Sequence, residues 1–300
     1  RKTKSSVSEA NTTDVEYRNV LMSNHVQAVA ADERDVWIGT DRGLSRLNRL
    51  TGTWTHYTMS DGLPSDSVND ILIDGDAVWF ATERGVSKLT LDAGTWRNFD
   101  ARDGLVGNNV TCITLDGNYL WFGTDRGLSR YDKGIDNWAA KTKEDGLSSN
   151  NITAIAVMEE YIWVGSKAEK RLPGMARWRR RNLGRGGVFR YDKSTDSWNE
   201  YSQSDGLVDN EISTIALDED TVWFGTFTDG ISIYSQTDQS FVKSYTQSDL
   251  LSSDDITDIT VDGNYIWIAT ANAGVQRHIK SVDTWMKYTT KDGLASDRVE

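Results

Sequence analysis

The sequence has few of the residues on which many functional sites depend. Among its 300 residues there are one cysteine, two prolines and three histidines. A lone cysteine, Cys112, excludes an intramolecular disulfide and a zinc site built from cysteines. No apolar run approaches the roughly 18 residues that a membrane-spanning helix needs, so we expect no membrane insertion. The histidines, His25, His56 and His278, are too dispersed to favour a histidine metal site or a Ser-His-Asp arrangement.

The net charge and the first residues of the chain bear on the class of function. Lysine and arginine number 33 against 45 aspartate and glutamate, which gives a formal net charge of −12. This balance argues against a nucleic-acid binder, because such proteins neutralise phosphates with lysine and arginine. The first residue is Arg1, so either a signal peptide was removed or the chain is part of a longer protein. Residues 1–14 are polar without an apolar period, and we expect a flexible tail there.

What the sequence has in abundance is a repeat. A string of Trp, an apolar residue, a small residue and Thr or Ser occurs six times, 42 residues apart except for later intervals of 60 and 44. A second marker, Asp-Gly-Leu, recurs between the copies with one degenerate version. The strings begin at Trp37, Trp79, Trp121, Trp163, Trp223 and Trp267, and the second markers at Asp61, Asp103, Asp145, Asp205, Asp249 and Asp292. Six copies in register indicate a repeat architecture.

One copy can be divided into four strands. In the second copy, apolar runs are separated by Asp-Gly and Gly-containing turns, of the kind that join antiparallel strands. The expected strands are Val68–Ile73, Ala77–Thr82, Val86–Leu91 and Thr95–Asp100. Four antiparallel strands in about 42 residues match one blade of a β-propeller.

The fold prediction is therefore an all-β protein, a β-propeller of four-stranded antiparallel blades. It has six complete repeats plus fragments of a seventh at the two termini, within a single domain of residues 15–300. Val15–Val20 resembles a fourth strand, and Asp292–Val299 matches the approach to a new first strand. Two outcomes stay open at this point. Either a longer chain makes seven blades, or six blades close and the ends are redundant.

The tryptophans fit the blades. Eleven of the twelve occupy the second or fourth strand of a copy. An aromatic in every blade predicts packing between neighbouring sheets, with the small residue after each second-strand Trp leaving room for the next sheet. A sugar-stacking surface is the alternative interpretation, and regularity favours the core.

The repeat resembles a known family. Asp61-Gly62-Leu63-Pro64-Ser65-Asp66-Ser67-Val68 and the string from Trp121 to Arg130 are similar to the two-component regulator propeller repeat. The resemblance covers nearly the whole chain beyond the tail. It implies a β-propeller that is part of an extracytoplasmic sensor region, often linked to polysaccharide sensing. The chain has no visible membrane helix, kinase or DNA-binding segment, so a free-standing propeller remains an alternative.

The fourth copy carries an insert. It is 18 residues longer than the first three copies, and the extra chain lies in the second turn, on the same face as the blade-to-blade crossings. Residues 167–185 hold eight basic residues and one acidic residue. Arginine forks suit carboxylate, sulfate or phosphate, and a tryptophan offers a stacking plane. A solvated loop is the alternative. The candidate binding residues are Lys167, Lys170, Arg171, Arg177, Trp178, Arg179, Arg180, Arg181 and Arg185.

The crossings add further candidates. An Asn or Asp stands two residues before each first-strand Val or Ile, where a turn-stabilising role is the default expectation. The next residue varies from copy to copy, as a binding face or an unconstrained surface would. The candidates at this variable position are His25, Asn109, Asn151, Glu211 and Asp255.

These observations predict a non-catalytic recognition or sensor propeller, periplasmic or extracellular. It binds an oligosaccharide, with an anionic one favoured by the insert, or a protein partner on the face of the crossings. No catalytic residue, metal ligand or cofactor is predicted, because no nucleophile or acid–base pair is gathered in one place. A propeller enzyme of the polysaccharide lyase or hydrolase type and a purely structural scaffold are the alternatives.

Overall fold

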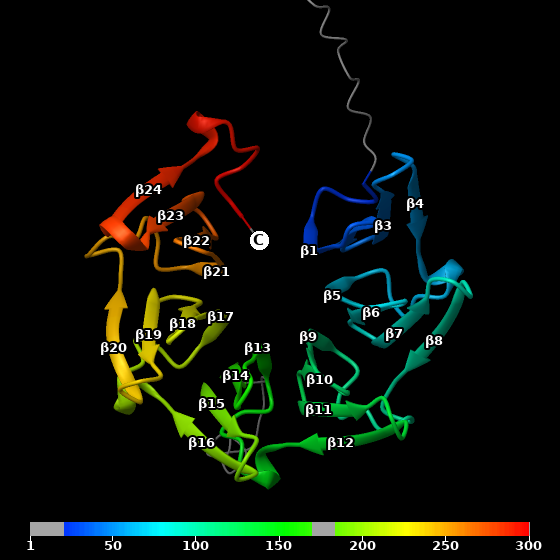
Figure 1. Ribbon diagram of the computed structural model, residues 1–300, viewed down its shortest axis with the longest axis horizontal. Coiled ribbons are helices and arrows are strands. Elements are labelled where there is room, and N and C mark those ends of the chain that lie inside the picture. Colours follow the sequence, from blue (N-terminus) through cyan, green and yellow to red (C-terminus); the bar gives the residue numbers. More distant parts are fainter. Residues whose placement is uncertain (1–20, 170–183, 300) are drawn as a thin grey trace, which may run out of the picture.

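The computed structural model describes residues 21–169 and 184–299. In this part of the chain, 24 strands form six antiparallel sheets of four strands each, and every sheet is a simple meander. The sheets follow one another around a common axis, with the first strand of each sheet innermost and the fourth outermost (Figure 1). The predicted β-propeller with six four-stranded blades is confirmed.

The strand boundaries agree with the sequence division to within one or two residues. The sheets are β1–β4 (Val26–Ala31, Asp35–Thr40, Gly43–Asn48, Trp54–Tyr57), β5–β8 (Val68–Asp74, Ala77–Thr82, Gly85–Thr90, Thr95–Phe99), β9–β12 (Val110–Asp116, Tyr119–Thr124, Gly127–Asp132, Asn137–Lys141), β13–β16 (Ile152–Val157, Tyr161–Ala168, Arg185–Asp192, Ser197–Tyr201), β17–β20 (Ile212–Asp218, Thr221–Thr226, Ile231–Ser235, Ser240–Tyr245) and β21–β24 (Ile256–Asp262, Tyr265–Thr270, Val275–Ile279, Thr284–Tyr288).

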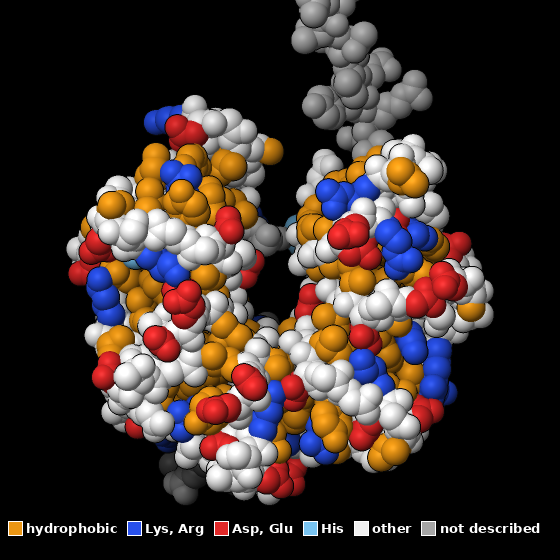
Figure 2. Space-filling model, in the orientation of Figure 1, with side chains coloured by type: hydrophobic (Ala, Val, Ile, Leu, Met, Phe, Trp, Pro, Cys, Tyr) orange, Lys and Arg blue, Asp and Glu red, His pale blue; other side chains and the backbone are white. Residues whose placement is uncertain are grey.

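The described residues contain no seventh sheet. Residues 289–299 form a short 3-10 turn, η5 (Thr290–Asp292), and a crossing, without pairing as a strand. The expected fourth-strand fragment at 15–20 lies outside the described residues. Figure 2 shows an opening between the first and last sheets that reaches the centre of the molecule. Within residues 21–169 and 184–299, no helix has the length and apolar character needed to cross a membrane.

Second-strand tryptophans pack between successive sheets, as predicted. Trp37, Trp79 and Trp163 are at most 1% exposed. Their rings lie 5.5, 6.2 and 5.4 Å from the rings of Phe80, Phe122 and Phe224, respectively, each of which belongs to the following sheet. Five apolar clusters result, and each joins one sheet to the next.

A cation on the third strand covers most of these tryptophans. The side chains lie 5.0 to 5.7 Å from the indole centroids, within the range of a cation–π interaction. This contact explains why the repeat keeps a basic residue in the third strand. The pairs are Arg46–Trp37, Lys88–Trp79, Arg130–Trp121, Arg190–Trp163 and Arg277–Trp267.

The small residue after each tryptophan is required by the next sheet. A Cβ atom on Gly165 would lie 2.6 Å from Cγ2 of Ile212, the first residue of β17. Glycine faces isoleucine in the same way at two further interfaces, Gly123–Ile152 and Gly225–Ile256. In the second sheet the position is Ala81, and the shorter Val110 shares its cluster. At the first interface the facing residue is a valine, Val68, whose Cγ1 would lie 2.8 Å from a Cβ atom on Gly39. A glycine or alanine is thus kept where the first strand of the next sheet approaches.

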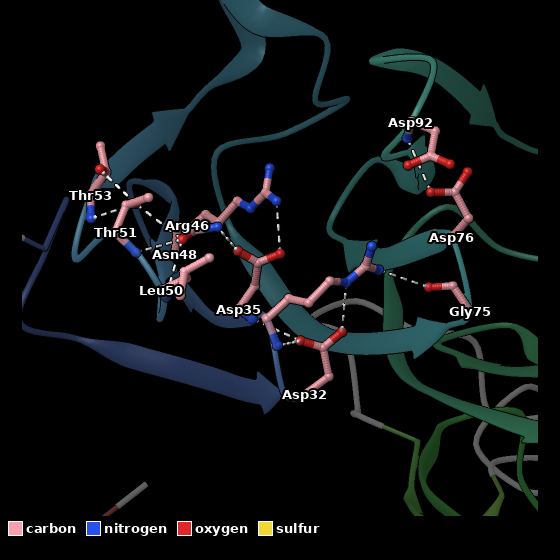
Figure 3. Close-up of polar contacts among 11 residues, drawn as sticks. Asp32, Asp35, Arg46, Asn48, Leu50, Thr51, Thr53, Gly75, Asp76 and Asp92 are labelled. Carbon is pink, nitrogen blue, oxygen red and sulfur yellow. Dashed lines mark hydrogen bonds and ion pairs between the residues drawn. The ribbon is translucent and has the colours of Figure 1, made fainter.

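The rim opposite the crossings is occupied by paired charges. Asp35, which is 1% exposed, accepts hydrogen bonds from Arg46 at 2.7 Å and from Asn48 at 3.3 Å (Figure 3). A lysine after the third strand of one sheet pairs with an aspartate at the end of the first strand of the preceding sheet. The pairs are Lys133–Asp74, Lys193–Asp116 and Lys280–Asp218. This rim therefore ties the sheets together.

The close contact between Gly165 and Ile212 gives a double-mutant test. Gly165→Ala should lower the free energy of unfolding by about 1–3 kcal/mol through overpacking. Ile212→Ala alone should cost about 2–5 kcal/mol. The double variant should be more stable than the sum of the two losses predicts, because Ile212→Ala removes the Cγ2 atom that the new methyl group would meet at 2.6 Å. Urea unfolding of the four proteins measures the coupling, and strictly additive losses would contradict the proposed contact.

Candidate ligand-binding face

The crossings and the second turns share one face of the propeller, as predicted. In five sheets the residue after the Thr or Ser of the tryptophan string donates its backbone N–H to a carbonyl of the incoming crossing. The accepting carbonyls belong to the five variable residues of the sequence analysis. These bonds are Asp41 N to His25 O, Asp125 N to Asn109 O, Lys167 N to Asn151 O, Phe227 N to Glu211 O and Ala271 N to Asp255 O. The predicted residues therefore occupy equivalent positions next to the inner strands.

The Asn and Asp residues just before them have a structural role. In each of six crossings the side-chain Oδ1 accepts a hydrogen bond from the backbone N–H seven residues earlier, at 2.5 to 2.9 Å. The acceptors are Asp66, Asn108, Asn150, Asn210, Asp254 and Asp297. Because these oxygens hold the crossings in shape, they are committed to the scaffold.

The insert emerges from this face through an extended hairpin. Strands β14 and β15 continue their pairing to Ala168 and Arg185, beyond the length of the other second turns. Glu169 anchors the hairpin to the preceding crossing, since its carboxylate contacts the Lys143 ammonium at 3.0 Å and the Asn150 backbone N–H at 3.2 Å. Lys167 and exposed Arg185 are described. The other predicted residues of the insert, Lys170, Arg171, Arg177, Trp178, Arg179, Arg180 and Arg181, lie outside the described residues.

A pocket of about 360 Å³ lies at the root of the hairpin. It brings together two predicted residues, Lys167 from the hairpin and Glu211 from the next crossing. Phe227, which is 37% exposed, completes it, and the Lys167 ammonium lies 5.1 Å from its ring centroid. Ala168 and Glu169 also line the pocket. An aromatic ring beside an ammonium and carboxylates offers both a stacking plane and hydrogen-bonding groups.

Phe227 was missed from the sequence, although a signal was present. It follows the Thr that ends the second strand, a position held by Asp41, Glu83 and Asp125 in the first three copies. An aromatic residue where four of the other five copies carry a charge marks a departure from the scaffold. The pocket also differs from the basic site that the insert predicts, because its described lining has one ammonium and two carboxylates.

The remaining predicted residues are not brought into this pocket. Asn151 is joined to the hairpin through its carbonyl, but it does not line the pocket. His25, Asn109 and Asp255 belong to other crossings around the axis. Within the described ranges, no three His, Cys, Asp or Glu side chains are grouped so as to hold a metal ion.

A second cavity of about 440 Å³ lies at the axis, between the inner strands. Equivalent positions of the six sheets line it, namely Ala28, Asp70, Cys112, Ala154, Thr214 and Asp258. Asp70 accepts hydrogen bonds from the backbone N–H groups of Ile71 and Ile113, at 2.8 and 2.7 Å. Burial nevertheless raises the pKa of its carboxyl to about 6. Burial and the Asp70 charge also raise the pKa of the Cys112 thiol to about 12, so the thiol stays protonated and unreactive.

Comparison with sequence families supports the resemblance. The profile of the two-component regulator propeller matches residues 104–126, from the second crossing to the second turn of the third sheet. This segment is similar to a two-component regulator propeller repeat. The predicted resemblance is confirmed, and the shared tryptophan and Asp-Gly-Leu markers extend the same pattern to the other sheets. Comparison with curated protein sequences gave no match.

Solved structures with the same fold are distant in sequence. The extracellular domain of a protein described as a hybrid two-component system, BT4673 from B. thetaiotaomicron, is 17% identical with a TM-score of 0.60; the match covers 91% of this chain and 42% of that one. YCF48 from Cyanidioschyzon merolae is 13% identical with a TM-score of 0.62, covering 90% and 87%. BamB from Moraxella catarrhalis is 15% identical with a TM-score of 0.59, covering 90% and 76%. These likenesses establish the propeller fold.

The half-buried carboxyl of Asp70, on the wall of the axial cavity, predicts a pH dependence of stability. Its pKa is raised from 3.8 to about 6, so the folded protein binds the proton more tightly than the unfolded chain does. The free energy of unfolding should therefore fall as the pH rises from about 4 to 6.5, and this contribution should be level above that range. Residual contact with channel water screens the charge, so we expect a change of about 1–3 kcal/mol.

The variant Asp70→Asn isolates this contribution, since it cannot ionise. As the pH rises from 4 to 6.5, the free energy of unfolding of the wild type should fall relative to that of the variant. Urea unfolding at half-unit pH intervals measures it. Parallel pH profiles for the two proteins would show that Asp70 does not titrate in this range.

Proposed function

We propose that this protein is a non-catalytic recognition domain that binds an oligosaccharide on the face of the crossings, at the root of the β14–β15 hairpin. The observation that carries the proposal is the pocket formed by Lys167, Glu169, Glu211 and Phe227. It lies where the longest departure from the regular repeat meets the scaffold. Loops that interrupt a regular scaffold are a usual place for function, because the scaffold itself does not need them.

The chemistry of the pocket supports a sugar ligand. The exposed ring of Phe227 can stack on the apolar face of a pyranose, while Lys167, Glu169 and Glu211 present hydrogen-bonding groups around it. The basic residues of the insert that lie outside the described part add positive charge to the sequence that follows Glu169. They favour an acidic oligosaccharide over a neutral one, although the pocket itself has more carboxylates than ammonium groups.

The proposed setting is extracytoplasmic, and the proposed role is sensing. The repeat matched by the family profile and the fold shared with an extracellular domain of a described hybrid two-component system support both. This chain spans 42% of that domain, so signalling by the whole protein is part of the proposal. A protein partner is the second candidate ligand. An enzyme of the polysaccharide lyase or hydrolase type and a structural scaffold are outcomes that the experiments below distinguish.

Removing the hairpin should abolish binding without unfolding the propeller. Replacing residues 167–186 by Asp-Arg recreates the second turn of the third sheet, where Asp125 and Arg126 connect Thr124 to Gly127. Wild type and variant would be titrated with a neutral pentasaccharide and a uronic-acid pentasaccharide by calorimetry. We expect binding only by the wild type, tighter for the acidic sugar. Equal binding by both proteins would remove the hairpin from the site, and release of new reducing or unsaturated ends would establish an enzyme.

A single substitution tests the stacking plane. Phe227→Ala should weaken oligosaccharide binding at least about tenfold, the equivalent of 1.4 kcal/mol. Leu50→Ala is the matched control, because Leu50 is 92% exposed in the turn after β3, on the rim opposite the crossings. Circular dichroism would verify that both variants are folded. If the two variants bind the pentasaccharides equally well, Phe227 does not contact the ligand; if neither sugar binds wild type, the ligand is not an oligosaccharide of these classes.

A further inference from the structure

The third sheet departs from the repeat at one position on its outer strand. In the five other sheets, the fourth strand carries a tyrosine or phenylalanine whose ring lies 5.7 to 6.1 Å from the ring of the second-strand tryptophan. The third sheet has Lys141 at this position, paired with Leu128 of β11. The aromatic residues of the other sheets are Tyr57, Phe99, Tyr201, Tyr245 and Tyr288.

The ring at this position fills a slot between two sheets. In four sheets it lies 4.9 to 5.9 Å from the aromatic ring that begins or nearly begins the fourth strand of the following sheet. The third and fourth sheets retain both walls of this aromatic slot. Trp121 forms one wall, and Tyr191 and Trp198 form the other, with the Tyr191 ring 5.9 Å from Trp121 and 4.9 Å from Trp198.

A cavity of about 120 Å³ lies in the aromatic slot of the third sheet. Trp121, Leu128, Tyr191 and Trp198 line it, together with Lys141. An apolar cavity of about 150 Å³ is large enough to bind benzene. The slot is therefore of a size to hold one aromatic ring whose substituent extends into solvent.

A second departure from the repeat opens the slot to solvent. Exposed Ala139 and Ala140 of β12 line the cavity. Ala139 is paired with Arg130, and in the second sheet the equivalent residue is Arg97, which lies over the ring of Phe99 at 4.5 Å. The third sheet thus has small side chains where a long side chain covers the ring of the second sheet. The residues equivalent to Ala139 are Thr55, Arg97, Asn199, Lys243 and Met286.

The charged groups that line the slot favour an anion. Arg130 and Lys141 both belong to its lining. The Lys141 ammonium donates to the carbonyl oxygen of Asp145 at 2.9 Å, and an ammonium has three N–H donors. The carboxylate of the lining, Asp196, accepts the hydroxyl of Tyr191 at 2.8 Å. Two cations therefore face one carboxylate that is already hydrogen-bonded within the protein.

We propose that the aromatic slot of the third sheet is a binding site for a small aromatic carboxylate. The ligand ring lies between Trp121 and Trp198, where the other sheets place their own tyrosine or phenylalanine, and Lys141 binds the ligand carboxylate. A free molecule is favoured over a tyrosine side chain of a protein partner, because the tyrosine ring carries no carboxylate.

This site is separate from the hairpin-root pocket. It lies between outer strands β12 and β16 on the side wall of the propeller (Figure 1), whereas the hairpin-root pocket lies between the fourth and fifth sheets. The inference therefore does not rest on the proposed function, and removal of the hairpin should leave it unchanged.

Titration with phenylacetate tests the proposal, and the indole N–H signals of nitrogen-labelled protein report binding by NMR. We expect the signals of Trp121 and Trp198 to shift with a Kd of about 1 mM or lower, as suits a ligand of roughly ten non-hydrogen atoms. Phenylacetamide, the uncharged isostere, should bind roughly two- to tenfold more weakly. Acetate should shift neither signal. No shift with phenylacetate would overturn the proposal, and equally tight binding of phenylacetamide would assign the slot to a neutral ring such as a partner's tyrosine.

Two substitutions of Lys141 separate the ring from the charge. Lys141→Tyr restores the residue of the other sheets, so this variant should melt no lower than wild type and should lose phenylacetate binding. Lys141→Met keeps the slot open without its ammonium, so it should bind phenylacetate and phenylacetamide with similar affinity, whatever the stability of the first variant. Lys287→Tyr is the matched control, because Lys287 is exposed on β24 of the sixth sheet, and it should bind as wild type does. Undiminished phenylacetate binding by folded Lys141→Tyr would overturn the proposal.

Discussion

The stacking of one sheet on the next through the second-strand tryptophan is the interaction on which the rest of the structure depends. Each sheet is a meander with little to bury by itself, and its apolar residues become a core only against a neighbour. The tryptophan is buried at the contact, a third-strand cation lies over its ring, and a glycine or alanine lets the next sheet approach. This stacking sets the positions of the crossings, the central cavity and the hairpin.

The two rims of the propeller serve different purposes. On one rim, lysine–aspartate pairs such as Lys133–Asp74 link adjacent sheets, so the charges there are used within the protein. On the other rim, Asn and Asp side chains hold the backbone of the crossings, which leaves the next residue in each crossing free to vary. A fixed frame with one variable position per blade is a suitable arrangement for recognition, because the ligand surface can change without disturbing the core.

The hairpin root shows how the insertion is attached to the scaffold. Glu169 is bound by Lys143 and by the backbone of Asn150, so the base of the hairpin is fixed to the crossing before it. The same region contributes Lys167 to the pocket, while the next blade contributes Glu211 and Phe227. The candidate site thus lies between two blades, and its geometry depends on their stacking.

The repeat spacing by itself determined the blades, because period-two strands and Asp-Gly turns leave few other ways to bury six regularly spaced tryptophans. It also placed the insert on the face of the crossings, since an antiparallel meander puts its second turn and its exit at the same end. The tertiary structure decided which residues from different blades are neighbours. Phe227 lies beside Lys167 only because two blades meet there. Asp70 is half-buried beside Cys112 only because the inner strands converge on an axis, which brings residues far apart in the sequence around one cavity.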